Sequence, residues 1–362
     1  MCYGWNGCRA GRKKMKIAGR KASKLIKHFI APAAVLLIIV LVFFRNISPA
    51  DIMANFLKIP AAYLIAFILL SLLGTVLRAW RYRILLSGKL AYKDVFLITL
   101  VRNFSVDLLP GRAAALGFYT WLAKKRGIAL EEGAPSFVIA VFYDSMALVM
   151  MLGGLLFFLE TEISHWPFYV GMAIILLLSI LVIFFSDRFF RFLLKGNALR
   201  RLHLARITGT LGGINDYLQA HSKNSERLKI FAISFALRIC KYLYNFILFE
   251  GILHLGTGLK NFSLFSFGLA ATELTALLPI QGPAGFGTWE LAFSFVFTTL
   301  QIPVANIKEA GIVIHITSQA WEYSIGLLAL AYLAFSGSAR KAAAIRPGAA
   351  GQPTSPDPNR SQ

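Results

Sequence analysis

The sequence has 362 residues, of which 57% are hydrophobic and only 15% are charged, whereas about 25% are charged in an average soluble domain. Together with a mean hydropathy of +0.63, this composition excludes a soluble globular enzyme and predicts an integral membrane protein. The 38 Lys and Arg against 17 Asp and Glu give a net charge of +21. The positions of these cations fit the excess of Lys and Arg on the cytoplasmic side of membrane proteins better than they fit a nucleic-acid-binding surface.

Residues 1–28 form a basic N-terminal segment, which we expect to be cytoplasmic. No small-residue cleavage site follows the apolar run after it, so this run is predicted to be a retained helix rather than a signal peptide. Met15 is an alternative start to Met1.

Six apolar runs have about the length that a helix needs to cross a bilayer, namely 28–44, 59–77, 134–159, 166–185, 229–253 and 310–335. Two further apolar stretches, 94–123 and 262–301, are interrupted by Pro and Gly, which break helices. Residues 186–228 are predicted to be an amphipathic cytoplasmic connector, and residues 336–362 a disordered cytoplasmic tail rich in Ala, Gly, Pro and Ser.

The cations predict the orientation. Thirty Lys and Arg fall in the segments assigned to one side, and only Arg45, Lys58, Lys260 and Lys308 fall in the opposite loops. Cytoplasmic loops carry the excess of Lys and Arg, so both termini should be cytoplasmic. Each broken stretch must then leave and re-enter on the same side. The expected location is the bacterial inner membrane.

The two broken stretches resemble each other. The first contains DLLPGRAAALGFYTW (107–121) and the second ALLPIQGPAGFGTWE (276–290), and their prolines, Pro110 and Pro279, are 169 residues apart. The same offset superimposes the flanking runs, so a repeat over about 59–159 recurs over about 228–335 within a membrane domain of residues 29–335. The sequence therefore predicts an all-α polytopic membrane protein with six transmembrane helices and two broken or re-entrant helical hairpins, arranged as an inverted repeat.

Broken helices and intramembrane charges supply the candidate substrate-binding residues. Unpaired backbone groups at a break cannot face lipid, and half-helix N-termini suit an anionic group. Ionisable residues at membrane depth mark functional sites by default, although they can equally be structural ion pairs, for example Arg112 or Arg238 with a carboxylate. The predicted set is Asp107, Pro110, Gly111, Arg112, Asp144, Arg238, Lys241, Glu273, Pro279, Gln281, Gly282, Gly285, Glu290 and Glu322.

Two helical faces extend this polar set. Arg238, Lys241, Tyr242 and Asn245 recur at helical spacing in the fifth run, and His315, Ser318, Gln319 and Glu322 do so in the sixth. No catalytic residue, metal site or cofactor is expected, because the sequence has no zinc-type Cys or His spacing and no HExxH, GxSxG or Walker motif.

The motifs LLPGR (108–112), LLPIQGPAGFGTWE (277–290) and RAWRYRILL (78–86) resemble the flippase-like transmembrane region of lysylphosphatidylglycerol synthases, the multiple peptide resistance factors. The resemblance covers about residues 30–335 and implies movement of lipid between leaflets. It does not extend to the synthase domain. After Pro-Gly-Arg this chain has Ala114 and Ala115 where many members have Gly-Glu, which points away from a cationic aminoacyl-lipid substrate.

The resulting hypothesis is a non-enzymatic flippase or transporter of a phospholipid or lipid-linked substrate. Its partners would be membrane lipids, with a homo-oligomer possible and no nucleic acid involved. Two alternatives remain open: a membrane accessory or assembly protein with a structural polar core, and an integral-membrane transferase using Glu290 or Asp144 as base.

Overall fold

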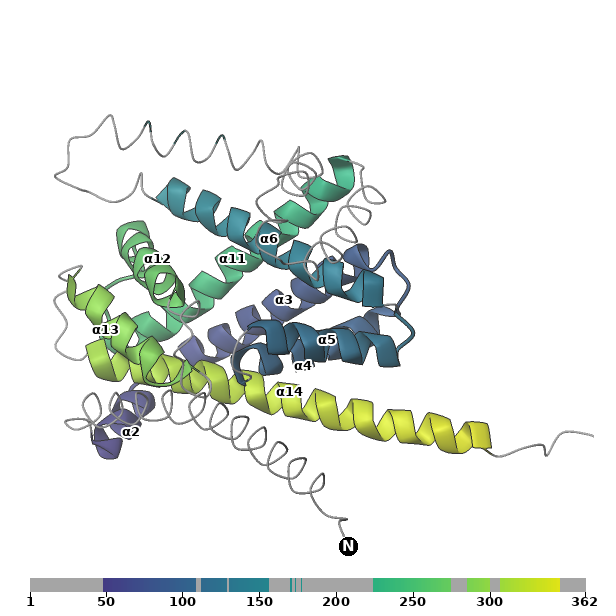
Figure 1. Ribbon diagram of the computed structural model, residues 1–362. Helices are drawn as coiled ribbons and strands as arrows, with labels where there is room; N and C mark the ends of the chain where they lie inside the picture. Colours follow the sequence, from purple (N-terminus) through teal and green to yellow (C-terminus); the bar gives the residue numbers. More distant parts are fainter. Residues whose placement is uncertain are drawn as a thin grey trace, which may run out of the picture.

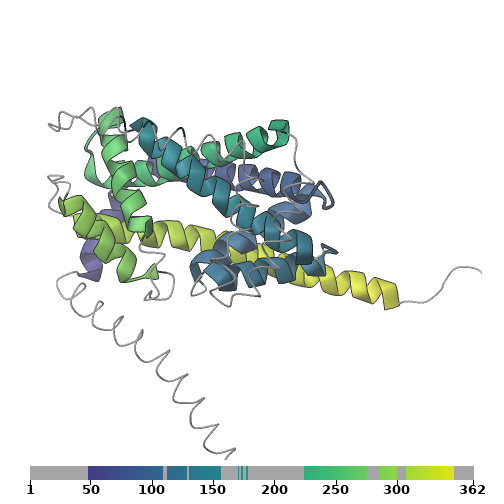
Figure 2. The ribbon, with the colours of Figure 1, turned by 45° about the horizontal axis from the view of Figure 1, so that its top comes forward.

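A computed structural model describes residues 48–108, 112–128, 130–155, 170, 173, 177, 224–274, 285–299 and 307–345. All regular secondary structure in these ranges is helical (Figures 1 and 2). The helices are α2 (Pro49–Leu57), α3 (Ala61–Leu85), α4 (Tyr92–Leu108), α5 (Arg112–Lys125), α6 (Leu130–Leu155), α11 (Asn224–Leu253), α12 (Leu259–Leu274), α13 (Thr288–Thr299) and α14 (Ile307–Ile345).

Three segments of the described chain are long and apolar enough to cross a membrane: Ala61–Leu85, Glu132–Leu155 and Ser225–Leu253. They match the predicted runs 59–77, 134–159 and 229–253. The run 310–335 lies in α14, which does not meet this criterion. The segment 1–28, the run 28–44 and nearly all of 166–223 lie outside the described residues. The membrane class is therefore confirmed, whereas the total of six spans stays a prediction.

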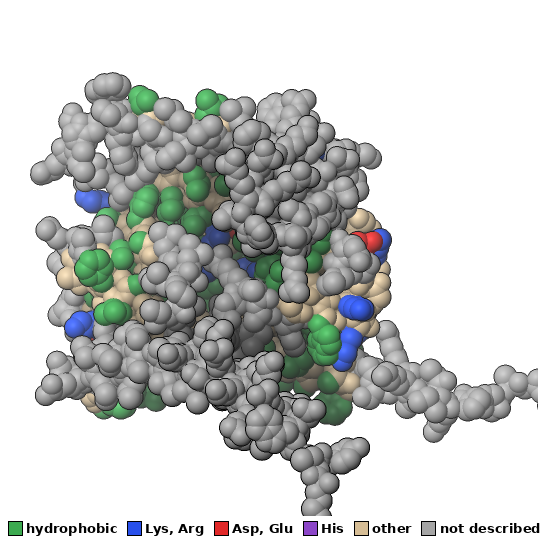
Figure 3. All heavy atoms as spheres, in the orientation of Figure 1, with side chains coloured by type: hydrophobic (Ala, Val, Ile, Leu, Met, Phe, Trp, Pro, Cys, Tyr) green, Lys and Arg blue, Asp and Glu red, His purple; other side chains and the backbone are tan. Residues whose placement is uncertain are grey.

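Helix α3 has the surface of a lipid-facing span. Large apolar side chains recur every three or four residues along one side and are 41–61% exposed: Ile65, Leu69, Leu73, Val76 and Trp80. The opposite side is buried, with Tyr82 fully inaccessible. Hydrophobic side chains are also visible on the outer surface in the space-filling view (Figure 3). An apolar exterior is the arrangement expected of a helix in a bilayer.

Helix α2 was not predicted. Ser48 caps it by accepting a hydrogen bond from the Ala50 N–H at 3.1 Å, and Pro49 occupies the first turn. A Ser N-cap followed by Pro is a local start signal, but the search for membrane-length runs passes over a helix of nine residues.

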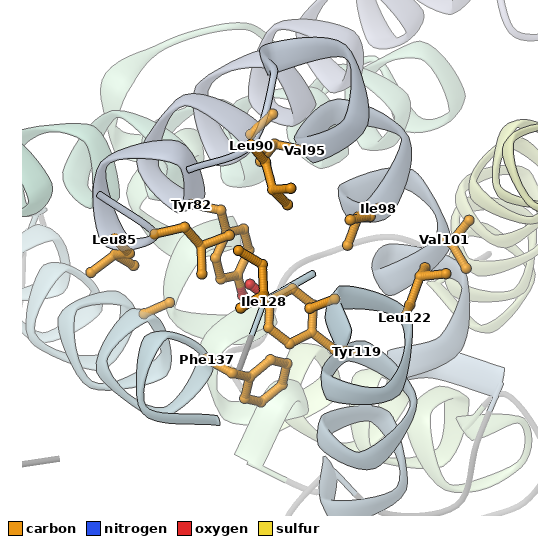
Figure 4. Packing of buried hydrophobic residues seen from close by; sticks show 14 of the residues in the cluster. Tyr82, Leu85, Leu90, Val95, Ile98, Val101, Tyr119, Leu122, Ile128 and Phe137 are labelled. Atoms are coloured by element: carbon orange, nitrogen blue, oxygen red, sulfur yellow. The ribbon is translucent and has the colours of Figure 1, made fainter. Parts of the chain in front are cut away.

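The helices occur in the order expected of the repeat, with α3 to α6 followed by α11 to α14. One buried cluster is formed mainly by α3 to α6 and includes Tyr82, Tyr119 and Phe137 (Figure 4). A second cluster is formed mainly by α11 to α14 around Phe249 and Phe293. The two sets meet where α3 packs along α11 and α4 along α14 (Figures 1 and 2). Each cluster also takes in residues of the other half, such as Phe67 in the second and Ile230 in the first, so the two halves share their packing.

Both predicted breaks fall between separate helices, and their prolines, Pro110 and Pro279, lie outside the described residues. α4 ends at Leu108 before α5 begins at Arg112, and α12 ends at Leu274 before α13 begins at Thr288. Gly285 and Gly287 have φ of 77° and 86°, a backbone conformation that favours Gly. These two glycines therefore shape the turn into α13.

Helix α14 continues to Ile345, beyond the predicted boundary at 335. Residues 339–345 read ARKAAAI, and Ala, Arg and Lys are good helix formers, so this part of the tail has helix propensity despite its low apolar content. Residues 346–362 lie outside the described chain.

We expect Gly326→Ala in α14 to destabilise the protein by about 1–3 kcal/mol, because overpacking forces neighbours to move. A Cβ on Gly326 would lie 2.4 Å from the Phe104 Cβ and 3.2 Å from the Leu100 carbonyl oxygen. Thermal unfolding in detergent measures the effect. The control is Gly117→Ala in α5, where an added Cβ meets nothing within 4 Å. Equal melting temperatures for the two variants would contradict the close packing of α4 on α14.

Candidate functional site

A polar cavity of about 260 Å³ lies within the bundle, lined by α3, α4, α6 and α11, by α12 and α14, and by the turn into α13. Its lining thus comes from both repeats. The charged residues on its wall are Arg78, Arg102, Asp144, Arg238, Lys241, Glu273 and Glu322.

The structure brings part of the predicted set together. Asp144, Arg238, Lys241, Glu273, Gly285 and Glu322 line the cavity, and Glu290 contacts the cavity residue His315. Asp107 and Arg112 lie at the facing ends of α4 and α5, but their side chains are outside the described part of the chain. The same is true of Pro110, Gly111, Pro279, Gln281 and Gly282 as whole residues. A role in substrate binding stays a prediction for the whole set.

Glu273 of α12 binds three side chains of one α11 face. Lys241 Nζ lies 2.6 Å from one carboxylate oxygen, and Arg238 Nη1 lies 3.2 Å from the other. The Tyr242 hydroxyl donates to the latter oxygen at 3.4 Å. The spacing i, i+3 and i+4 places these donors on the same side of α11, so Glu273 fixes α12 against α11.

Arg81 and Asp144 form a buried ion pair between α3 and α6. The guanidinium contacts both carboxylate oxygens, at 2.5 and 3.1 Å, and also donates to Ser234 Oγ of α11 at 2.7 Å. Arg81 is fully buried, whereas the Asp144 side chain is 18% exposed. Asp144 is therefore neutralised within the described chain.

Arg78 and Arg81 correct the charge count that predicted the topology. Both were assigned to a cytoplasmic loop, but both lie within α3 and point to partners inside the bundle. The apolar run ends at residue 77, whereas the helix continues to Leu85. Buried cations look like loop cations in sequence because their acidic or amide partners lie on other helices. The excess of cations on the predicted cytoplasmic side is still large without them.

Arg102 is a cavity residue that the sequence interpretation missed. It lies in α4, and its Nη1 donates to Asn103 Oδ1 at 3.3 Å, while Arg78 Nη1 donates to the same oxygen at 2.6 Å. A signal was available, because Arg102 is an ionisable residue inside the first broken apolar stretch. Arg112, ten positions later, was selected on that same ground.

Glu290 and His315 join the second break to α14. Glu290 accepts a hydrogen bond from the Gly287 N–H at 2.7 Å, and its other oxygen lies 2.5 Å from His315 Nδ1. The imidazole also lies against the rings of Phe286 and Trp289, with both centroid distances at 4.6 Å. Glu290 and His315 are 1% and 4% exposed. The partner of Glu290 is thus a histidine, and the pair holds the turn that precedes α13.

The cavity combines charges of both signs. Its lining includes four cationic and three acidic side chains. No cluster of three or more His, Cys, Asp or Glu with metal-binding geometry occurs among the described residues. Its volume lies just below the range of about 300–1,000 Å³ of pockets that enclose a drug-sized ligand, so a group enclosed in it would have to be small.

Comparison with known proteins shows the family of the chain. No curated protein matches the chain significantly. A family model described as the lysylphosphatidylglycerol synthase TM region matches residues 29–326, which include all seven charged residues of the cavity wall. The chain therefore belongs to the lysylphosphatidylglycerol synthase transmembrane-region family.

Proposed function

We propose that this protein moves a phospholipid or lipid-linked substrate between the leaflets of the bacterial inner membrane. The observation that carries the proposal is a polar, charged cavity inside a bundle with an apolar outer surface. A head group crossing the bilayer needs such a cavity because leaving its charges in hydrocarbon is costly. The acyl chains can remain in the lipid beside the exposed apolar side of α3.

The proposed architecture is the predicted one, with six spans and two re-entrant hairpins in an inverted repeat. What supports it is that each broken stretch contains two separate helices, α4 and α5 in the first and α12 and α13 in the second. Helices that stop inside the bilayer need their ends buried in protein or beside a wet cavity, and the turn into α13 lines the cavity.

Leaflet exchange in liposomes tests the function. The purified full chain is reconstituted with fluorescent phospholipids, and dithionite quenching reports the fraction that becomes accessible from outside. We expect faster exchange of at least one phospholipid class than in protein-free vesicles. Rates equal to those of protein-free vesicles across anionic, zwitterionic and polyprenyl-linked lipids would contradict the proposal.

The interhelical ion pairs favour one alternative function, a membrane accessory protein with a structural polar core. Arg81 with Asp144, and Glu273 with Arg238 and Lys241, are charge pairs that join different helices. Such pairs can fix helix register without any ligand. A transferase using Asp144 or Glu290 as base is less favoured, because Arg81 neutralises the first and the second is bound to His315 and Gly287.

The proposed topology makes a labelling prediction. Cysteines introduced at Lys58 and Lys308 should react with an impermeant maleimide in intact cells, and those at Lys89 and Lys125 should react only after lysis. The reason is the concentration of Lys and Arg on the cytoplasmic side. External labelling at Lys125 would rule out the first re-entrant hairpin and, with it, the inverted repeat.

A further inference from the structure

Two arginines on the cavity wall form no ion pair in direct contact with a carboxylate of the described residues. Arg78 of α3 and Arg102 of α4 both donate to the side-chain oxygen of Asn103. This amide is neutral, so it accepts hydrogen bonds without cancelling either charge. The other cations of the cavity, Arg238 and Lys241, are paired with Glu273.

Each of the two guanidinium groups also has a hydrogen-bond donor that is not used. The Nε atoms of Arg78 and Arg102 are buried and find no acceptor in the described chain. A buried donor without an acceptor destabilises the protein, and more so when the group is charged. Arg102 and Arg78 also repel each other, and the Asp144 and Glu322 carboxylates attract Arg78 only through space. A bound anion would therefore supply the direct acceptor that both guanidinium groups lack.

The surroundings hold these two side chains in place. Asn103 is 5% exposed, and the Arg102 guanidinium carbon lies 5.2 Å from the centre of the Phe137 ring, which orients the cation over the ring face. Arg78, Arg102, Asn103 and Phe137 all line the cavity. The packing of α3 on α4 and the Phe137 ring thus fix two planar donors before any ligand binds.

We propose that Arg78 and Arg102 form a phosphate-binding subsite of the cavity. A guanidinium presents a rigid fork of N–H donors that matches phosphate oxygens two at a time. In the setting of the proposed transport function, the ligand is the phosphate of a lipid head group. A soluble phosphate has the same chemistry, and the experiment separates the two sources.

The test measures ligand-induced thermal stabilisation of the purified full chain in detergent micelles. Three probes are compared: phosphatidylglycerol, a diacylglycerol with the same acyl chains, and inorganic phosphate. We expect phosphatidylglycerol to raise the melting temperature, and diacylglycerol, which has no phosphate, to leave it unchanged. A comparable rise with inorganic phosphate alone would support the subsite and assign it to a soluble ligand.

The double variant Arg78→Gln/Arg102→Gln should lose this response. We expect its apparent affinity for the responding probe to fall at least about tenfold, because each charge-assisted hydrogen bond contributes about 1.5–3 kcal/mol and 1.4 kcal/mol is a factor of ten. Its melting temperature without ligand should not fall, since two like charges have been removed. The matched control is Arg83→Gln, an exposed arginine in the same helix, which should respond like the wild type.

A response of the double variant equal to that of the wild type, or equal stabilisation by diacylglycerol, would overturn the proposal. If the Gln variant does not fold, Arg78→Lys/Arg102→Lys keeps the charge but loses the fork, and an undiminished response there overturns it too. Leaflet exchange is scored separately. Normal exchange by the double variant would overturn the assignment of Arg78 and Arg102 to the transported head group and leave the transport proposal standing. Phosphate binding without exchange in the wild type would support the subsite and reject the transport proposal.

Discussion

Arg81→Gln should lower the free energy of unfolding by about 3–5 kcal/mol, because removing one partner of a buried ion pair leaves an uncompensated charge in the interior. The Asp144 carboxylate would lose both contacts to the guanidinium, and Ser234 Oγ would lose its donor. The three side chains come from α3, α6 and α11, so the substitution weakens the packing between these three helices. Thermal or denaturant unfolding in detergent measures it.

Two further variants separate the effect of a buried charge from a general sensitivity to mutation. Lys89→Gln breaks the pair with Glu132, in which the side chains are 51% and 32% exposed, and should cost less than about 1 kcal/mol. The double variant Arg81→Met/Asp144→Leu should recover much of the stability lost in Arg81→Gln, because no unpaired charge remains. Similar losses for Arg81→Gln and Lys89→Gln would mean that the Arg81 site is not effectively buried.

Glu290→Ala should reduce leaflet exchange at least about tenfold and destabilise the fold, because one side chain holds both the turn before α13 and His315. The Gly287 N–H and His315 Nδ1 would lose their partner at a position that is 1% exposed. Each buried polar group left unsatisfied costs about 1–3 kcal/mol. Exchange should fall because Gly285, in the same turn, lines the cavity.

Glu290→Gln distinguishes support of the turn from a role of the charge itself. Gln has the same length and can still accept from the Gly287 N–H, so it should preserve most of the thermal stability. Exchange that stays low in a stable Glu290→Gln protein would assign a role to the carboxylate charge, whereas recovery of both properties would make Glu290 a structural residue. Glu309→Ala, at the first turn of α14 and away from the cavity wall, is the control and should behave like the wild type.

The pairing of charges shows where prediction from sequence succeeded and where it failed. The helical spacing of Arg238, Lys241 and Tyr242 placed them on one face, and Glu273 was recognised as a carboxylate next to the second break, with Arg238 among its candidate partners. Arg78 and Arg81 were missed, because an arginine directly after an apolar run resembles a loop cation. Only the packing of α3 against α4 and α6 shows that both point into the bundle.

The hydropathy was enough to determine the membrane class and three candidate spans of the described chain, and the Pro and Gly motifs were enough to place both breaks between separate helices. These are local properties, since apolar length, helix propensity and a missing N–H act within a few residues of sequence. The composition of the cavity is not local. It joins Arg78 to Asn103, 25 residues away, and Arg238 to the backbone carbonyl of Asp144, 94 residues away. Which polar side chains meet depends on how the helices of two repeats pack, and only the tertiary structure decided this.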